Sequence, residues 1–92
     1  RAERDSYKID LERDGVRLEL FTFPNAPKRP SRPEALGLRH LAFELNNLEG
    51  FQTELKTKQV LNVEDIRVDE YTGKKFFFFP DPDGLPIEIY EA

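Results

Sequence analysis

The 92-residue sequence contains no cysteine and only one histidine. Without cysteine, the chain has no disulfide framework, no thiolate metal site and no cysteine nucleophile. No apolar run approaches the length of a membrane-spanning helix, so we expect no membrane segment. A chain without cysteine is compatible with the reducing cytoplasm, which is where we expect this protein to act.

A cluster of basic residues is also missing. The net charge is −4 at pH 7, and charged residues of both signs, 35% of the chain, are interspersed along the sequence. Nucleic acids and anionic membranes are recognised through patches of lysine and arginine, so we expect neither as a partner. The interspersed charges indicate a solvated surface around one small folded domain, residues 1–92.

A short pattern occurs twice in the chain, at residues 14–21 and 83–90. Both copies read Asp-Gly, two variable residues, aliphatic, Glu, aliphatic, aromatic. Asp-Gly between alternating runs is a strong hairpin signal, because glycine readily adopts the positive φ that a tight turn needs. The following strand has period two, so Glu19 and Glu88 each lie on the face opposite an aliphatic pair. The sequence therefore predicts the same hairpin twice.

The remaining pattern predicts an α+β fold. Four prolines within residues 24–37 exclude a helix or a central strand there and indicate a linker. Leu48, Phe51 and Leu55 form one apolar stripe of a helix capped by Asn46 or Asn47 and ending near residue 58 or 59. Strands are expected at residues 6–13, 16–23, 38–45, 63–69, 74–79 and 85–91. After the linker the order is strand, helix, strand, strand, strand; before it, only the last two strands of such a unit are present.

Three side chains are candidates for chemistry: Glu19, His40 and Glu88. Each is expected in the middle of a strand, on the face opposite its aliphatic residues. Two carboxylates and an imidazole suit a divalent cation that prefers nitrogen and oxygen ligands, such as Zn, Ni, Mn, Fe or Co. Two simpler interpretations stay open: a lone histidine on a strand is more often structural or exposed, and Glu19 could lie on the wet side of an edge strand.

Four segments resemble one family: Gly37–Phe43, Ile66–Asp69, Tyr71–Lys74 and Asp81–Tyr90. They are similar to the glyoxalase/bleomycin-resistance/dioxygenase superfamily, also called vicinal oxygen chelate proteins, and within it to small bacterial glyoxalase I-like proteins. The resemblance implies paired βαβββ modules whose mixed sheets curl into a cleft around a metal. Residues 1–23 would then be the end of an incomplete first module, 24–37 the linker and 38–92 the second module.

The resemblance also implies a ligand set: a histidine on the first strand, a glutamate on the last strand of module one, a histidine opening module two and a glutamate on its final strand. The last three fall on Glu19, His40 and Glu88. The first histidine has no counterpart in this sequence, and we expect an upstream segment to carry it.

The activity implied is that of a lactoylglutathione lyase-like metalloenzyme. Its substrate would be small and oxygen-chelating, such as the hemithioacetal of a 2-oxoaldehyde with a thiol cosubstrate like glutathione. Glu88 or Glu19 would move the proton. The apolar wall would consist of Phe21, Phe23, Tyr90 and one face of residues 76–79, whereas Arg17 or Lys74 could bind an anionic group of the substrate.

Two other functions fit the same fold. An extradiol-type dioxygenase would use His40, Glu88 and the absent histidine, and would keep its metal and activity after Glu19→Gln. A non-enzymatic resistance protein would sequester a drug in the cleft, normally without metal ligands. The Phe-rich face and the pairing of modules between chains further predict a homodimer.

Overall fold

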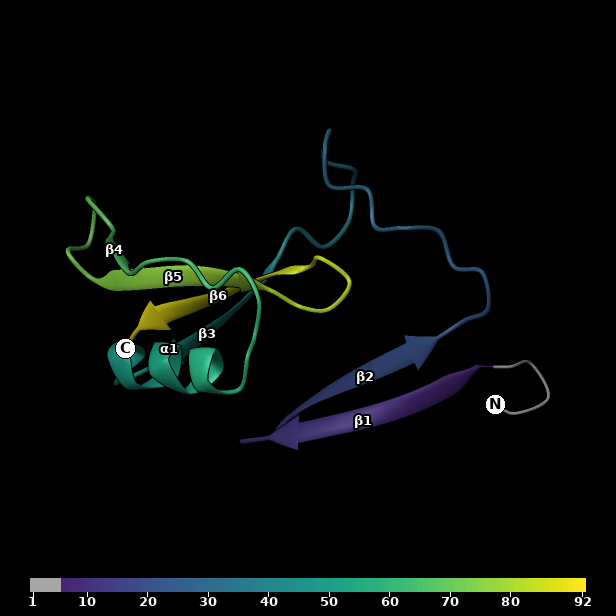
Figure 1. The fold of residues 1–92 in the computed structure, drawn as a ribbon, viewed down its shortest axis with the longest axis horizontal. Coiled ribbons are helices and arrows are strands. Elements are labelled where there is room, and N and C mark those ends of the chain that lie inside the picture. The colour runs from purple at the N-terminus through teal and green to yellow at the C-terminus, as the bar shows by residue number, and fades with distance from the viewer. Residues whose placement is uncertain (1–5) are drawn as a thin grey trace.

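The computed structural model describes residues 6–92 and contains two sheets and one helix (Figure 1). A two-stranded sheet pairs β1 with β2, and a four-stranded sheet has the order β3-β6-β5-β4. The elements are β1 (Tyr7–Arg13), β2 (Val16–Thr22), β3 (Leu41–Leu45), α1 (Leu48–Thr57), β4 (Arg67–Val68), β5 (Lys75–Pro80) and β6 (Pro86–Glu91). No helix in this part of the chain is both long and apolar enough to cross a membrane.

The first predicted hairpin is confirmed. Asp14 and Gly15 both have positive φ, 50° and 80°, as the favoured two-residue turn between twisted strands requires. The strands pair antiparallel from Arg13 opposite Val16 to Tyr7 opposite Thr22. One face of this hairpin carries aliphatic side chains and the other carries mostly charged ones, because side chains alternate along each strand.

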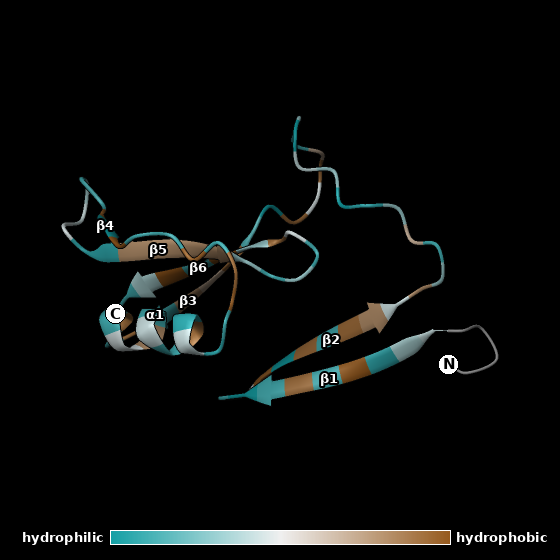
Figure 2. Ribbon diagram, viewed as in Figure 1, coloured by the Kyte–Doolittle hydropathy of each residue, from teal (hydrophilic) through white to brown (hydrophobic). Residues whose placement is uncertain are grey.

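The helix covers one face of the four-stranded sheet and forms the core with it. Phe77 and Ile89 from the central strands and Leu48 and Leu55 from α1 are all buried. Asn47 caps the helix, since its side chain accepts a hydrogen bond from the backbone N–H of Gly50 at 3.0 Å. Figure 2 shows apolar residues along β5 and β6 above the helix, and also along β1 and β2. Within residues 6–92, the buried core therefore lies in residues 41–91.

The opposite face of this sheet, which we call the open face, carries the chemistry. Directly paired residues lie on the same face of a sheet. Glu88 pairs with both Ala42 and Phe78, and Tyr90 pairs with both Glu44 and Phe76. β3 runs parallel to β6 whereas the other neighbours are antiparallel, so the sheet is mixed, as predicted.

Two predicted strands are shorter in the structure by several residues. The strand expected at residues 38–45 begins at Leu41, which leaves His40 just outside it. Continuing the β3–β6 register would place His40 opposite Pro86, whose nitrogen has no hydrogen to extend the ladder. The strand expected at residues 63–69 is reduced to Arg67–Val68. Ahead of this short strand, the backbone N–H of Glu64 still donates to the carbonyl of Phe78 on β5, but the carbonyl of Glu64 accepts from the Gln52 side chain and not from a strand neighbour.

The second Asp-Gly turn differs from the first. Residues 81–85 form a longer loop, in which the backbone N–H of Asp81 donates to the carbonyl of Leu85. The Asp81 carboxylate accepts from the backbone N–H groups of Asp83 and Leu85 and so closes the loop. Within residues 81–85, only Gly84 has a positive φ. The repeated sequence therefore gives two hairpins with matching second strands but different turns.

Candidate metal and substrate site

His40 and Glu88 lie together at the open face. The Nε2 atom of His40 is 3.2 Å from Oε1 of Glu88, although the residues are far apart in sequence. The Glu88 side chain is 17% exposed and that of His40 is 35% exposed, so the carboxylate is sheltered while the imidazole is reached from solvent. The pair joins a central strand to the segment that enters β3.

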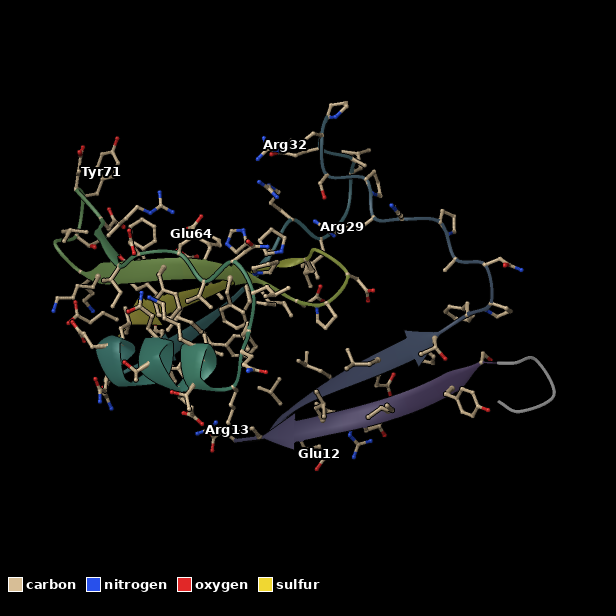
Figure 3. The ribbon with its side chains drawn as sticks, in the orientation of Figure 1. Glu12, Arg13, Arg29, Arg32, Glu64 and Tyr71 are labelled. Atoms are coloured by element: carbon tan, nitrogen blue, oxygen red, sulfur yellow. The ribbon has the colours of Figure 1, made fainter. Side chains whose placement is uncertain are left out.

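Several contacts position His40 although it lies outside a strand. The ring meets Phe78 edge to face, with the ring centres 5.3 Å apart. One nitrogen of the Arg29 guanidinium donates to the carbonyls of Leu38 and Arg39, at 3.2 and 3.0 Å. Figure 3 shows Arg29 on the linker beside the four-stranded sheet. The linker thus holds the backbone that immediately precedes His40.

Aromatic rings form the floor of the open face next to the pair. Phe76 packs edge to face on Phe78 and stacks with Tyr90, with ring centres 6.3 Å apart in both cases. The guanidinium of Arg67 lies 4.9 Å from the centre of the Phe76 ring. Phe76 and Phe78 are half-buried, whereas Phe77 between them is buried against the helix side, so the apolar run of β5 is fully buried on one face only. This aromatic floor therefore remains accessible from one side.

The Tyr90 hydroxyl ties this floor to the turn that follows β4. It donates to Oδ2 of Asp69 at 2.8 Å and shares a hydrogen bond with the Thr72 hydroxyl. Oδ1 of Asp69 accepts from the backbone N–H of Tyr71, and this bond, followed by that of Tyr90, lowers the pKa of Asp69. Tyr90 was expected to line the site, and its ring does share a face with Glu88.

Glu19 lies elsewhere, on the hairpin. Its carboxylate is 2.9 Å from the ammonium of Lys8, which also lies 3.5 Å from Asp10. The hydrogen bond to Glu19, together with the charge of Asp10, raises the pKa of Lys8. Figure 1 shows the hairpin set to one side of the four-stranded sheet. Within residues 6–92, no three metal-binding side chains form a group that could hold a cation.

The other predicted substrate residues are divided between the two sheets. Phe21 and Phe23 stack on each other on the hairpin, with ring centres 6.1 Å apart, and both are more than half exposed. Arg17 is paired with Glu12. Lys74 is exposed at the end of the turn after β4. The structure thus brings Tyr90 to the His40–Glu88 pair but leaves Phe21, Phe23 and Arg17 on the hairpin.

The donor set of the pair suits a divalent cation. An imidazole nitrogen and a carboxylate oxygen are ligands for Zn and its neighbours in the transition series. Two ligands bound about 2.0–2.1 Å from one tetrahedral zinc lie roughly 3.3 Å apart, and the observed separation is 3.2 Å. His40 and Glu88 therefore fit such an ion, whereas Glu19 does not join them in this arrangement.

Four side chains around these residues were not predicted: Lys8, Arg29, Asp69 and Thr72. A signal for Lys8 was present in the sequence. The two-residue turn at Asp14-Gly15 fixes the register and places Asp10 directly opposite Glu19, so a cation beside them was to be expected. The sequence pattern offers no comparable signal for the other three, whose contacts depend on loops.

The fold agrees with the comparison with known proteins. Residues 2–89 match the model of the glyoxalase/bleomycin resistance protein/dioxygenase superfamily. The match spans nearly the whole chain, and the protein belongs to this superfamily.

The chain is also similar to two bacterial proteins and to a solved structure. The chain is 54% identical to the uncharacterized protein YaeR of Escherichia coli and 53% identical to the uncharacterized protein YwkD of Bacillus subtilis. Each alignment covers 99% of this chain and 70% or 71% of the relative. The chain is also similar to the crystal structure of a glyoxalase family protein from Enterococcus faecalis, with 47% identity and a TM-score of 0.89, over 99% of this chain and 71% of that one.

More distant structures share the fold alone. A lactoylglutathione lyase from Agrobacterium tumefaciens superposes with a TM-score of 0.64 at 20% identity, over 92% of this chain and 68% of that one. The fosfomycin resistance protein FosX from Listeria monocytogenes gives 0.63 at 14%, over 97% and 74%. The same architecture thus occurs in proteins with different names and roles.

Proposed function

We propose that this protein is a metal-dependent, glyoxalase I-like lyase or isomerase. Its substrate would be a small compound with adjacent oxygens, such as the hemithioacetal of a 2-oxoaldehyde and a thiol like glutathione. Superfamily membership supports the general class, and the distant likeness to a lactoylglutathione lyase is compatible with the reaction. The proposal includes a cytoplasmic setting, with which the absence of cysteine is compatible.

One observation carries this proposal: the imidazole of His40 and the carboxylate of Glu88 lie side by side on an open, aromatic-floored face. A structural role alone would be served by burying both groups, but the His40 side chain remains 35% exposed. A pair of nitrogen and oxygen ligands that is sheltered by rings yet reached from one side is typical of a site that binds a ligand.

His40 and Glu88 would both bind the cation, and Glu88 would also transfer the proton. His40, through Nε2, and Glu88, through Oε1, would hold the cation, which when bound would supply Lewis-acid polarisation of the substrate oxygens. The Glu88 carboxylate, which lies beside His40 on this face, would accept and return the substrate proton. Glu19 could move that proton only from the hairpin. Phe76 and Phe78 would exclude water from one side of the substrate.

An isomerisation assay with a matched pair of variants tests the proposal. We expect the metal-loaded protein to convert the methylglyoxal–glutathione hemithioacetal, and Glu88→Gln to lower kcat by at least about 100-fold. Glu44→Gln is the control, because Glu44 is an exposed carboxylate on the same face, opposite Tyr90. Equal rates for both variants and the unmodified protein would contradict the proposed role of Glu88.

A second function has its own supporting observation. The extradiol-type dioxygenase needs His40 and Glu88 but not Glu19, and Glu19 lies apart from the pair in the described chain. The two functions differ in their response to Glu19→Gln. Loss of metal and of isomerase activity would favour the lyase, whereas an unchanged metal content with oxygen-dependent cleavage of a catechol would favour the dioxygenase.

A further inference from the structure

Arg67 lies on the open face, at the β4 end of the sheet. It is directly paired with Phe76, which is directly paired with Tyr90, so all three residues share that face. The guanidinium lies 4.9 Å from the centre of the Phe76 ring, within the range of a cation–π contact. This contact holds the side chain against the aromatic floor, although 55% of the side chain is exposed. Arg67 therefore presents an accessible positive charge on the face that carries His40 and Glu88.

The charge of Arg67 is shared with one carboxylate. Its Nη2 atom donates to Oε1 of Glu64 at 2.9 Å, and the Glu64 side chain is itself 47% exposed. Ion pairs this exposed are weak and readily accommodate a further ligand. A guanidinium has five N–H donors in a planar fork that matches a carboxylate, and this hydrogen bond uses one of them. A guanidinium already shared with Glu64 suits a single further negative charge, which favours a carboxylate over a dianionic phosphate.

A hollow beside the aromatic floor connects Arg67 with the candidate site. Its volume is about 240 Å³, and its lining consists of Asn62, Glu64, Phe78, Phe79, Pro80 and Pro86. Phe78 is the ring that contacts His40, whereas Glu64 is the carboxylate that binds Arg67. A ligand on the open face thus has room between the two ends of the floor.

The strand register gives the separation of these two ends. Arg67 is opposite Phe76, whereas Glu88 is opposite Phe78, two residues further along β5. Two strand spacings across the sheet and two residues along it place the Cα atoms of Arg67 and Glu88 roughly 12 Å apart. An extended peptide covers about 3.3–3.6 Å per residue, so a ligand of about three residues spans most of this separation.

We propose that Arg67 is a specificity-determining residue that binds a carboxylate of the substrate at the far end of the aromatic floor. The inference rests on the proposed function for the other end of the substrate, which His40 and Glu88 would hold through the cation. It narrows the substrate to a peptide-like thiol conjugate with a free carboxylate. The sequence had indicated Arg17 or Lys74 for this role, but Arg17 lies on the hairpin and Lys74 in the turn after β4.

Calorimetric titration with S-methylglutathione and with its diethyl ester tests the inference. Neither compound can form a hemithioacetal, and the ester has the same chain without free carboxylates. The net charge of −4 disfavours the more anionic compound, so a preference for it requires a local cation. We expect the diacid to bind about two- to fivefold more tightly than the diester, the range for exposed ion pairs.

Three variants locate that preference. Arg67→Met should remove it, whereas Arg67→Lys keeps the charge without the planar fork and should retain part of it. Lys74→Met is the matched control, because it removes a cation from the neighbouring turn and should leave the preference unchanged. Circular dichroism of each variant checks that the fold persists.

The other outcomes separate this inference from the proposed function. Equal Kd values for the two compounds, no binding of either, or a preference that persists in Arg67→Met would overturn the inference. A preference lost equally in Lys74→Met would assign the effect to general charge and would also overturn it. If Glu88→Gln lowers kcat as expected while both compounds bind equally, the lyase stands and the inference is wrong. If Arg67 confers the preference but no hemithioacetal is converted, the carboxylate site stands and the proposed lyase is wrong.

Discussion

At the scale of single residues, the two halves of the His40–Glu88 pair are held in different ways. Glu88 lies within the central strand β6, between Ala42 and Phe78 of its neighbours. His40 precedes β3 and depends on the ring of Phe78 and on Arg29, which binds the preceding carbonyls. The carboxylate is therefore placed by the sheet, whereas the imidazole is placed by side-chain contacts.

The Tyr90 hydroxyl gives a prediction at this scale. Tyr90→Phe keeps the ring that stacks on Phe76 but removes the hydroxyl bonds to Asp69 and Thr72. Because these bonds tie the turn after β4 to β6, we expect the backbone amides of residues 70–74 to exchange with deuterium about five- to tenfold faster.

Tyr71→Phe is the matched control for that measurement. Tyr71 is 98% exposed and points outward at the tip of the same turn (Figure 3), so losing its hydroxyl should leave amide exchange unchanged. Unchanged exchange in Tyr90→Phe as well would show that the hydroxyl does not hold the turn.

The sequence predicted residue positions best where strand periodicity determines them. Glu88 and Tyr90 share the open face because side chains alternate, and Ile87 and Ile89 face the helix for the same reason. The position of His40 could not be derived in this way, because the nitrogen of Pro86 ends the ladder before the histidine is reached. Glu19 was expected beside the other two, but convergence of different strands is a property of the tertiary fold, which strand periodicity does not encode.

At the scale of elements, the helix is joined to the sheet by an ion pair as well as by the core. The ammonium of Lys75 on β5 is 2.7 Å from the carboxylate of Glu49 in the first turn of α1. The hydrogen bond between them is the main cause that lowers the pKa of Glu49 and raises that of Lys75. The charged forms of both groups are thus favoured in the folded protein.

This pair predicts a pH dependence of stability. Because the pKa of Glu49 is lower in the folded chain than in the unfolded one, its contribution is present above the unfolded value and is lost as pH falls through the folded value. Because the pKa of Lys75 is raised, its contribution is present below its unfolded value and is lost as pH rises through the folded value. The pair therefore stabilises the fold at neutral pH.

Urea unfolding at several pH values measures this effect. We expect Glu49→Gln to reduce stability at neutral pH and to remove part of the decline seen on acidification. Lys75→Met should have the same effect at neutral pH, since either change breaks the same contact. Parallel curves for Glu49→Gln and the unmodified protein between neutral and acid pH would contradict the coupling.

The helix and strands were predicted well where a local sequence signal exists. They were predicted less well where contacts made by a loop determine the backbone hydrogen bonds. Asp14-Gly15 gave the first hairpin with its register, and Asn47 with the apolar stripe gave the helix. Residues 63–69 were predicted as one strand, of which only Arg67–Val68 forms a strand in the structure. Val63 and Ile66 pack against the core, and the Glu64 N–H donates to the Phe78 carbonyl, but the Gln52 side chain of the helix binds the Glu64 carbonyl that a strand neighbour would otherwise use.

At the scale of the whole molecule, the hairpin makes the chain elongated. The radius of gyration is 15.5 Å, whereas a compact domain of this length has about 12 Å. The aliphatic face of the hairpin, with Ile9 opposite Leu20, is about half exposed. The corresponding face of β6 is covered by α1. This contrast supports the proposal that the protein forms a homodimer in which a second copy covers the hairpin.

Light scattering coupled to size-exclusion chromatography tests the homodimer. We expect twice the chain mass of 10.8 kDa at micromolar concentration, and a monomer after Ile9→Lys, which places a charge on the aliphatic face. Glu12→Lys, on the other face of the same strand, is the control and should remain a dimer. A monomer of the unmodified protein at micromolar concentration would remove the proposal.

The central claim is that His40 and Glu88 hold a divalent cation, and metal content tests it most directly. Plasma mass spectrometry would be applied to the unmodified chain, Glu88→Gln and the control Glu44→Gln after dialysis against a weak chelator. The account predicts near-stoichiometric Zn, Ni, Mn, Fe or Co in the unmodified protein and in Glu44→Gln, with a loss of at least about tenfold in Glu88→Gln. Equal metal content in Glu88→Gln and the unmodified protein, or no retained metal in any of them, would contradict it.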